Sequence, residues 1–179
     1  RRAHGGTIDR ALLATGAVHH HLVREHTRTE CGLVVESGEP REVMHFALLT
    51  GYGAGAVNPY LAFETIQDLI EREELVEEYP GKAIKNFLKA IENAMLKTMS
   101  KIGISTQHSY RNAQIFEAVG LSTKLVERCF TGTASRVEGI DVEDVAKESL
   151  MRHAVAYPSA HARARELDPG GQYRWRKRG

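Results

Sequence analysis

The thirty residues from 31 to 60 constrain the fold most, because they read as one complete strand, helix and strand. Residues 33–35 form a short unbroken apolar run, which is typical of a strand covered on both faces in a parallel sheet. A helix is predicted to open at Pro40, where a missing N–H costs nothing, and to end before Gly51. Residues 56–57 are too short to be anything but a buried second strand. Parallel strands joined by a crossover of this length form a βαβ unit, most often right-handed.

Polar side chains follow both predicted strands. Glu36 and Ser37 come after the first strand, and Asn58, followed by Pro59, is predicted to cap the next helix with its side-chain oxygen. In parallel α/β folds, ligands gather at the carboxyl ends of the strands. The spacing is similar to that of the last two strands of phosphate-binding (β/α) barrels, but Glu36 and Glu39 lie where an anion would arrive. Coulomb repulsion therefore argues against a phosphate site at this edge.

The totals exclude several classes of function. With 179 residues, 42% of them hydrophobic and 26% charged, the composition is that of an ordinary globular domain. A formal net charge of +1 provides no field to steer nucleic acid, and no apolar run approaches the ~20 residues of a membrane span. Cys31 and Cys129 predict neither a disulfide framework nor a metal site, which fits a reducing cytoplasm. Because no initiator methionine opens the sequence, we expect the chain to begin inside a larger polypeptide.

The rest of the chain is predicted to be mainly helical. Apolar spacing predicts amphipathic helices at 10–25, 59–74, 84–99, 110–119, 121–130 and 142–154. A brief strand is predicted at 104–106, and a polar loop at 131–136, whose hydroxyls lack the spacing and the lysine of a P-loop. The predicted fold class is therefore α/β, with a partial (β/α)-barrel-like parallel sheet and a mainly helical C-terminal half.

Three consecutive histidines lie inside the first predicted helix. Neighbours on a helix are about 100° apart, so His19, His20 and His21 cannot converge on one metal ion from a single face. The geometry favours the alternative that one histidine packs in the core while the others are solvated or cap carbonyl groups. His19 or His20 is the better functional candidate, because the apolar face of the helix would carry either of them inward.

The last eight residues, 172–179, alternate aromatic and basic side chains. Stacking on such a tail is one way to bind single-stranded nucleic acid. A cut end of a longer chain explains the segment more simply, since eight residues give a nearly neutral protein little electrostatic footprint. We therefore expect no nucleic-acid partner and no membrane partner.

Several ordered motifs resemble a known family of large enzymes. In the first part they are 12–22 (LLATGAVHHHL), 32–38 (GLVVESG), 45–49 (HFALL), 51–54 (GYGA) and 56–64 (AVNPYLAFE). These motifs are similar to the end of the central domain of the glutamate synthase large (alpha) subunit. Further on, 99–106 (MSKIGIST), 113–121 (AQIFEAVGL), 130–136 (FTGTASR) and 168–171 (DPGG) resemble the segment leading into the flavin-binding barrel of that family.

The resemblance implies that residues 1–120 are the C-terminal part of the central domain and that residues 121–179 are a helical connection into the FMN-binding synthase domain. It also implies a parent enzyme that hydrolyses glutamine at an N-terminal amidotransferase domain and passes the ammonia through an internal tunnel. That enzyme reductively aminates 2-oxoglutarate to L-glutamate at an FMN barrel with a 3Fe-4S cluster. Its electrons come from an NAD(P)H-dependent small subunit or from ferredoxin. The implied compartment is the cytoplasm, or the plastid stroma in a photosynthetic eukaryote.

On this resemblance the chain itself is expected to be an inactive structural link between domains. We predict no catalytic, cofactor-binding or metal-binding residue in it, because two cysteines cannot supply the three-cysteine cluster of the family. The polar residues of interest are His19, His20, Glu36, Ser37 and Asn58, which we expect at the carboxyl edge of the sheet in hydrogen bonds between domains. One alternative is a free-standing protein-interaction module without catalysis. Another, a metal-dependent or sugar-phosphate enzyme that uses Glu36, His19 and Asn58, is disfavoured by the lack of ligand spacing.

Overall fold

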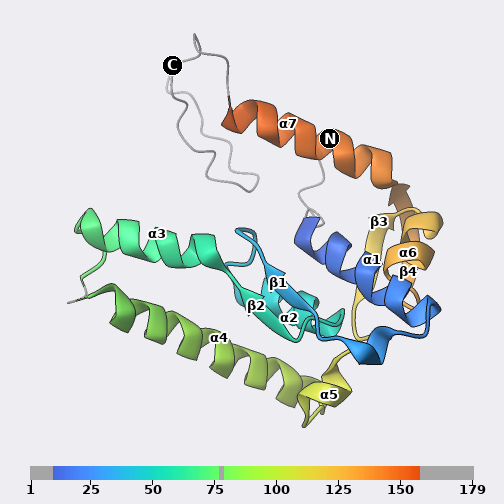
Figure 1. The fold of residues 1–179 in the computed structure, drawn as a ribbon, viewed down its shortest axis with the longest axis horizontal. Coiled ribbons are helices and arrows are strands. Elements are labelled where there is room, and N and C mark those ends of the chain that lie inside the picture. The colour runs from blue at the N-terminus through green and yellow to red at the C-terminus, as the bar shows by residue number, and fades with distance from the viewer. Residues whose placement is uncertain (1–9, 77–78, 158–179) are drawn as a thin grey trace, which may run out of the picture. The chain divides into compact units, whose positions relative to one another are not determined.

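A computed structural model describes residues 10–76 and 79–157 of the chain (Figure 1). Its elements are α1 (Arg10–Arg24), the 3-10 helix η1 (Arg28–Glu30), β1 (Val34–Glu36), α2 (Val43–Gly51), β2 (Ala56–Asn58), α3 (Tyr60–Glu71), α4 (Pro80–Ile102), α5 (Gln107–Tyr110), β3 (Glu117–Leu121), α6 (Thr123–Cys129), β4 (Ala134–Ile140) and α7 (Val142–Ala156). The elements up to Asp141 belong to one compact unit, and α7 belongs to a second, described by itself. The motif at 168–171 and the tail at 172–179 lie outside the described residues. Within the described ranges, no helix is both long and apolar enough to cross a membrane.

The predicted βαβ unit is confirmed. β1 and β2 pair in parallel, with Val34 opposite Ala56 and Val35 opposite Val57, and α2 joins them. The fold class is confirmed as α/β, with parallel strands and a large helical content. The expected burial of the first strand on both faces is wrong, because Val34 is 75% exposed. The burial expected of the second strand is wrong too, because Ala56 and Asn58 are exposed and Val57 is half-buried.

The helix between these strands begins later than predicted. α2 begins at Val43 and not at Pro40, which is fully buried in the turn before it. Glu42 is the N-cap residue, and its carboxylate accepts a hydrogen bond from the backbone N–H of His45 while the His45 ring accepts one from the backbone of Glu42. This reciprocal capping box satisfies two backbone donors that the helix cannot satisfy itself.

A second βαβ unit, which the sequence pattern did not predict, is formed by β3, α6 and β4. Its strands pair in parallel, with two shifts of register along the ladder. The helix predicted at 110–119 is therefore wrong: α5 ends at Tyr110, and residues 117–121 are a strand. The strand predicted at 104–106 is also wrong, and the second half of the loop predicted at 131–136 belongs to β4. The helix predicted at 121–130 is confirmed as α6.

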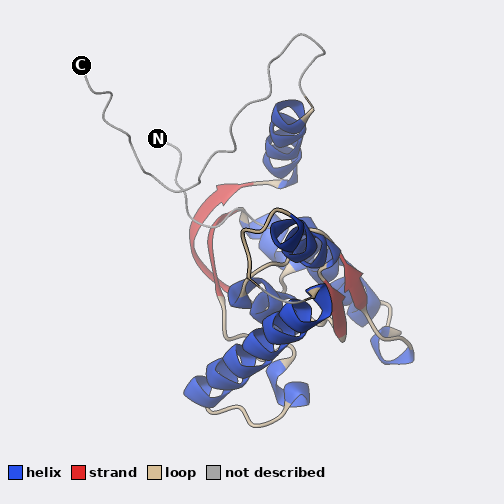
Figure 2. Ribbon diagram, turned by 90° about the vertical axis from the view of Figure 1, so that its left-hand side faces the viewer, coloured by secondary structure: helices blue, strands red, loops and turns tan. Residues whose placement is uncertain are grey.

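The buried core lies where α1 packs against α6 and α2. Its most buried apolar side chains are Ala47, Leu49, Ala54, Tyr110, Leu125, Cys129 and Phe130. At the crossing of α1 and α6, a Cβ atom on Gly16 would overlap the backbone carbonyl of Cys129 and the ring of Phe130. The absence of a side chain at Gly16 is therefore what allows the two helices to approach. Figure 2 shows the two strand pairs apart from each other, with helices between them.

α3 and α4 form a helical hairpin, and both helices were predicted from their apolar spacing. Phe87 of α4 contacts Phe63 of α3 and Phe46 of α2, with ring centroids 6.2 and 6.3 Å apart. α4 ends at Gly103, which adopts a left-handed conformation with φ of 73°, as is common after a helix. The hairpin is thus attached to α2 by aromatic packing along the inner stripe of α4.

Candidate functional site

The carboxyl ends of β1 and β2 meet, as predicted. Glu36 lies opposite Asn58 in the ladder, and Asn58 Nδ2 donates a hydrogen bond to Glu36 Oε2 at 3.1 Å. The backbone N–H of Ser37 donates to the carbonyl of Asn58 at 3.2 Å. The predicted capping of α3 by Asn58 is wrong, because Pro59 is the N-cap residue and no side chain bonds to the end of the helix. The amide of Asn58 is used across the strands instead.

The acidic residue beyond this edge binds the start of α1. One carboxylate oxygen of Glu39 accepts a hydrogen bond from Arg10 Nε at 2.9 Å, and the other accepts one from the backbone N–H of Ala11 at 2.7 Å. A negative charge is favourable at this end of a helix because the helix dipole is positive there. A carboxylate of the chain itself therefore occupies the kind of position that a bound anion takes in other α/β proteins.

A polar cluster surrounds His19 near the other end of α1. His19 is 6% exposed, and its Nδ1 accepts a hydrogen bond from Arg28 Nε at 2.9 Å. The same guanidinium donates to the carbonyl of Cys31 and to the carbonyl of Gly53, both at 2.9 Å. Because Nδ1 is the acceptor, the hydrogen-bond network assigns the proton of the neutral imidazole to Nε2.

Both buried histidines are held in the neutral form. Burial lowers the pKa of His19 to about 4; the charges of His20 and Arg28 lower it too, and the Asn112 side chain raises it. Burial also lowers the pKa of His20, and the charge of Arg24 adds to that effect. The two rings touch edge to face, with centroids 4.9 Å apart. We expected one histidine to pack inward, but two do, since His20 is also 6% exposed.

The five polar residues singled out from the sequence do not gather at one edge. Arg28 joins His19 to Cys31, which precedes β1, and to Gly53, which precedes β2, so this cluster lies at the amino ends of the strands. The reason is that α1 begins beside Glu39, after β1, and runs back toward the other edge. In the part of the chain that the structure describes, no group of three His, Cys, Asp or Glu side chains is arranged to hold a metal ion.

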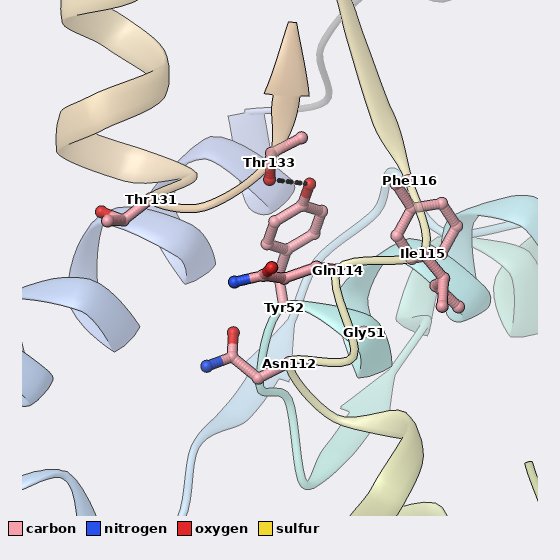
Figure 3. Close-up of a pocket in the computed structure, with 8 residues that line it drawn as sticks. All are labelled: Gly51, Tyr52, Asn112, Gln114, Ile115, Phe116, Thr131 and Thr133. Carbon is pink, nitrogen blue, oxygen red and sulfur yellow. Dashed lines mark hydrogen bonds between the residues drawn. The ribbon is translucent and has the colours of Figure 1, made fainter.

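A small cavity lies between the end of α2 and the loops at 112–116 and 131–133 (Figure 3). Its volume is about 10 Å³, roughly the space for one water molecule. Tyr52 Oη and Thr133 Oγ1 are hydrogen-bonded at 2.7 Å on one side of it, and Gln114 also lines it (Figure 3). A cavity of this size excludes a phosphate, so the polar residues 131–133 serve as a turn that packs on α2.

Sequence reasoning missed Arg28 and Tyr52 as organising residues. The acceptors of Arg28 lie on three segments between residues 19 and 53, and Tyr52 bonds to a residue 81 positions away. The spacing of apolar residues along a segment does not reveal contacts between residues so far apart in sequence. One signal in the sequence was the glycine at position 53. In the structure Gly53 has φ of 109° and leaves no room for a Cβ atom beside the His19 ring. A glycine at that point was compatible with close approach of another side chain.

Comparison with known proteins agrees with the motifs. Residues 6–122 match the family model "Glutamate synthase central domain". The chain is 48% identical over 168 residues to the large chain of the NADPH glutamate synthase of Bacillus subtilis, covering 94% of this chain and 11% of that protein. It is 41% identical over 179 residues to the NADH glutamate synthase of Saccharomyces cerevisiae, covering 94% of this chain and 8% of that protein. It is 42% identical over 176 residues to ferredoxin-dependent glutamate synthase 2 of a Synechocystis species, covering 90% of this chain and 11% of that protein.

The chain thus spans about a tenth of the length of these relatives, and nearly all of it aligns with them. The family model covers both strands of the first βαβ unit, the histidine cluster and the α3–α4 hairpin. Sequence motifs, fold class and relatives point the same way, and the chain belongs to the glutamate synthase family, in the region of its central domain.

Proposed function

We propose that this chain is a structural link between domains of a glutamate synthase and that it does not itself carry a reaction. The parent enzyme would make L-glutamate from 2-oxoglutarate and glutamine-derived ammonia. Its other parts, an amidotransferase domain and an FMN barrel, would be the partners of this segment. A small subunit that uses NAD(P)H, or ferredoxin, would supply electrons, since the relatives' names include NADPH, NADH and ferredoxin. The compartment would be the cytoplasm or the plastid stroma.

One observation carries the proposal: the polar side chains that face the two edges of the first sheet are bonded to each other. Glu36 binds Asn58, Glu39 binds the start of α1, and Arg28 binds His19. A reactive site would need such groups to converge on a space for substrate. The side chains instead close the edges, as expected of a rigid support.

We infer from the described residues that this segment does not hold the cofactors of the parent enzyme. A flavin site needs several hundred Å³, whereas the cavity beside Tyr52 has about 10 Å³. An open depression of about 300 Å³ lies on α4 along Lys85, Leu88 and Glu92, but all of its walls belong to one helix. An iron–sulfur cluster of the family type would need three thiolates, and the chain has two cysteines, of which Cys31 is exposed and Cys129 is buried. FMN and the 3Fe-4S cluster would therefore be held by other parts of the enzyme.

The interdomain role is tested with Glu36→Ala in a full-length large chain that carries this segment. Loss of the carboxylate frees the Asn58 amide and loosens the sheet edge that we propose faces a neighbouring domain. We expect glutamine-dependent glutamate formation to fall about fivefold relative to ammonia-dependent formation, a typical size for coupling between sites. The measurement is the ratio of the two steady-state rates, together with the rate of glutamine hydrolysis.

The matched control is Glu92→Ala, which removes an exposed carboxylate paired with Lys89 on α4, away from that edge. It is expected to leave the ratio unchanged. If Glu36→Ala alters neither the ratio nor the thermal stability of the enzyme, the sheet edge has no interdomain role.

A further inference from the structure

A single arginine holds together three segments that lie between residues 19 and 53. Arg28 of η1 donates one N–H to the ring of His19 on α1, one to the carbonyl of Cys31 before β1, and one to the carbonyl of Gly53 before β2. All three donor–acceptor distances are 2.9 Å. The His19 ring fills the space next to Gly53, where a Cβ atom would overlap Nδ1. The approaches to both strands are therefore anchored by one guanidinium, which His19 Nδ1 helps to hold in place.

We propose that His19 and Arg28 form an acid-sensitive latch, which opens when His19 Nδ1 takes up a proton and releases the segments before β1 and β2. The nitrogen has one lone pair, so it accepts either the Arg28 N–H or a proton from solvent. Protonation therefore breaks the hydrogen bond and places two cations side by side. The step forms one N–H bond at Nδ1 with a proton from solvent, and return to neutral pH removes that proton and restores the acceptor.

The surroundings of His19 favour this response. The groups that act on it are His20 on the same helix, Arg28 on η1 and the uncharged Asn112 on the loop after α5; no carboxylate is among them. His20 in turn faces Arg24, whose guanidinium also bonds to the carbonyl of Arg128 on α6. A proton gained by either histidine thus places a positive charge on a buried ring beside an arginine.

The sign of the pH dependence follows from the pKa of His19, which burial lowers from 6.5 to about 4. Between these two values the open state binds more protons than the latched state, so latching weakens as pH falls. The latch is fully formed above pH 6.5, and the weakening levels off below pH 4. The upper part of this window lies above the range in which most carboxylates titrate, and its lower end overlaps that range, so the non-titrating variant at position 19 is needed to separate the two effects.

Hydrogen exchange of the 179-residue chain tests the latch, with rates corrected for the intrinsic effect of pH. Between pH 7 and pH 4.5 we expect protection of residues 28–36 and 53–58 to fall about tenfold or more, because opening is coupled to proton uptake. Protection within α4 is expected to change less than about twofold, since that helix lies outside the latch. His19→Gln supplies an amide oxygen for Arg28 that does not titrate, so this variant is expected to keep its protection at pH 4.5.

His21→Gln is the matched control, because His21 is the exposed neighbour on the same helix, and it is expected to respond like the parent chain. If His19→Gln fails to fold, Arg28→Met provides the test. This variant is expected to lack protection of residues 28–36 and 53–58 already at pH 7. The latch is refuted if His19→Gln loses protection with pH as the parent does, or if Arg28→Met retains full protection at pH 7.

Discussion

Replacing Leu125 by alanine is expected to lower the free energy of unfolding by about 3 kcal/mol, within the range measured for fully buried leucines. Leu125 is 1% exposed and lies on α6, which packs against α1, β3 and β4. The variant loses the transfer free energy of one methine and two methyl groups and leaves a cavity that the surrounding helices and strands fill incompletely. Urea unfolding followed by far-UV circular dichroism measures the change, since the described chain is rich in helix.

An exposed leucine provides the comparison. Leu96 on α4 is 56% exposed, so Leu96→Ala is expected to change the stability by less than about 0.5 kcal/mol. The midpoint for Leu125→Ala should shift by more than 1 M urea at an unchanged slope, given a slope of about 2 kcal/mol per M for a chain of this size. A loss below about 1 kcal/mol for Leu125→Ala would mean that α6 does not cover the core as described.

Gly16→Ala is expected to destabilise the chain by about 2 kcal/mol, although alanine is the better helix former. In an exposed helix interior the same change would stabilise by up to about 1 kcal/mol. At Gly16 the added Cβ meets the backbone carbonyl of Cys129, which cannot rotate away, and the ring of Phe130. The overlap separates α1 from α6, and the loss of their packing exceeds the gain in helix propensity.

The control is Gly32→Ala, where a Cβ atom meets nothing within 4 Å and φ is negative or extended. This variant is expected to be neutral or to stabilise the chain by up to about 1 kcal/mol. Thermal unfolding of both variants in the same buffer compares them directly. An increase in stability for Gly16→Ala would show that α1 and α6 do not approach each other as closely as the crossing requires.

Sequence periodicity predicted the elements that are long or that carry their own end signals. α1, α3 and α4 lie within a few residues of the predicted ranges, because an amphipathic stripe and a terminal Gly103 or Pro59 are local features. The segment at 110–119 was misread as a helix because five residues of strand carry little pattern of their own. β3 is a strand because it pairs with β4, which follows α6 in the chain. The residue spacing within 110–119 cannot predict that pairing.

The candidate site was predicted in part for the same reason. Glu36 and Asn58 were expected together, since parallel strands bring their carboxyl ends to one edge, and the ladder pairs them. His19 was expected to turn inward, but its position at the opposite edge depends on the direction of α1, which is set by Glu39 and Arg28. Those contacts join residues far apart in sequence, so they become visible only in the folded chain.

We propose, as the central claim, that this segment supports a glutamate-forming enzyme without holding its cofactor or performing its chemistry. Absorbance spectroscopy of the purified 179-residue chain, before and after titration with FMN, tests it most directly, with reductive amination of 2-oxoglutarate assayed on the same sample. We expect no flavin band in the purified chain, no saturable FMN binding at micromolar concentration and no formation of glutamate. A yellow chain that retains stoichiometric FMN through gel filtration, or that forms glutamate, would contradict the claim.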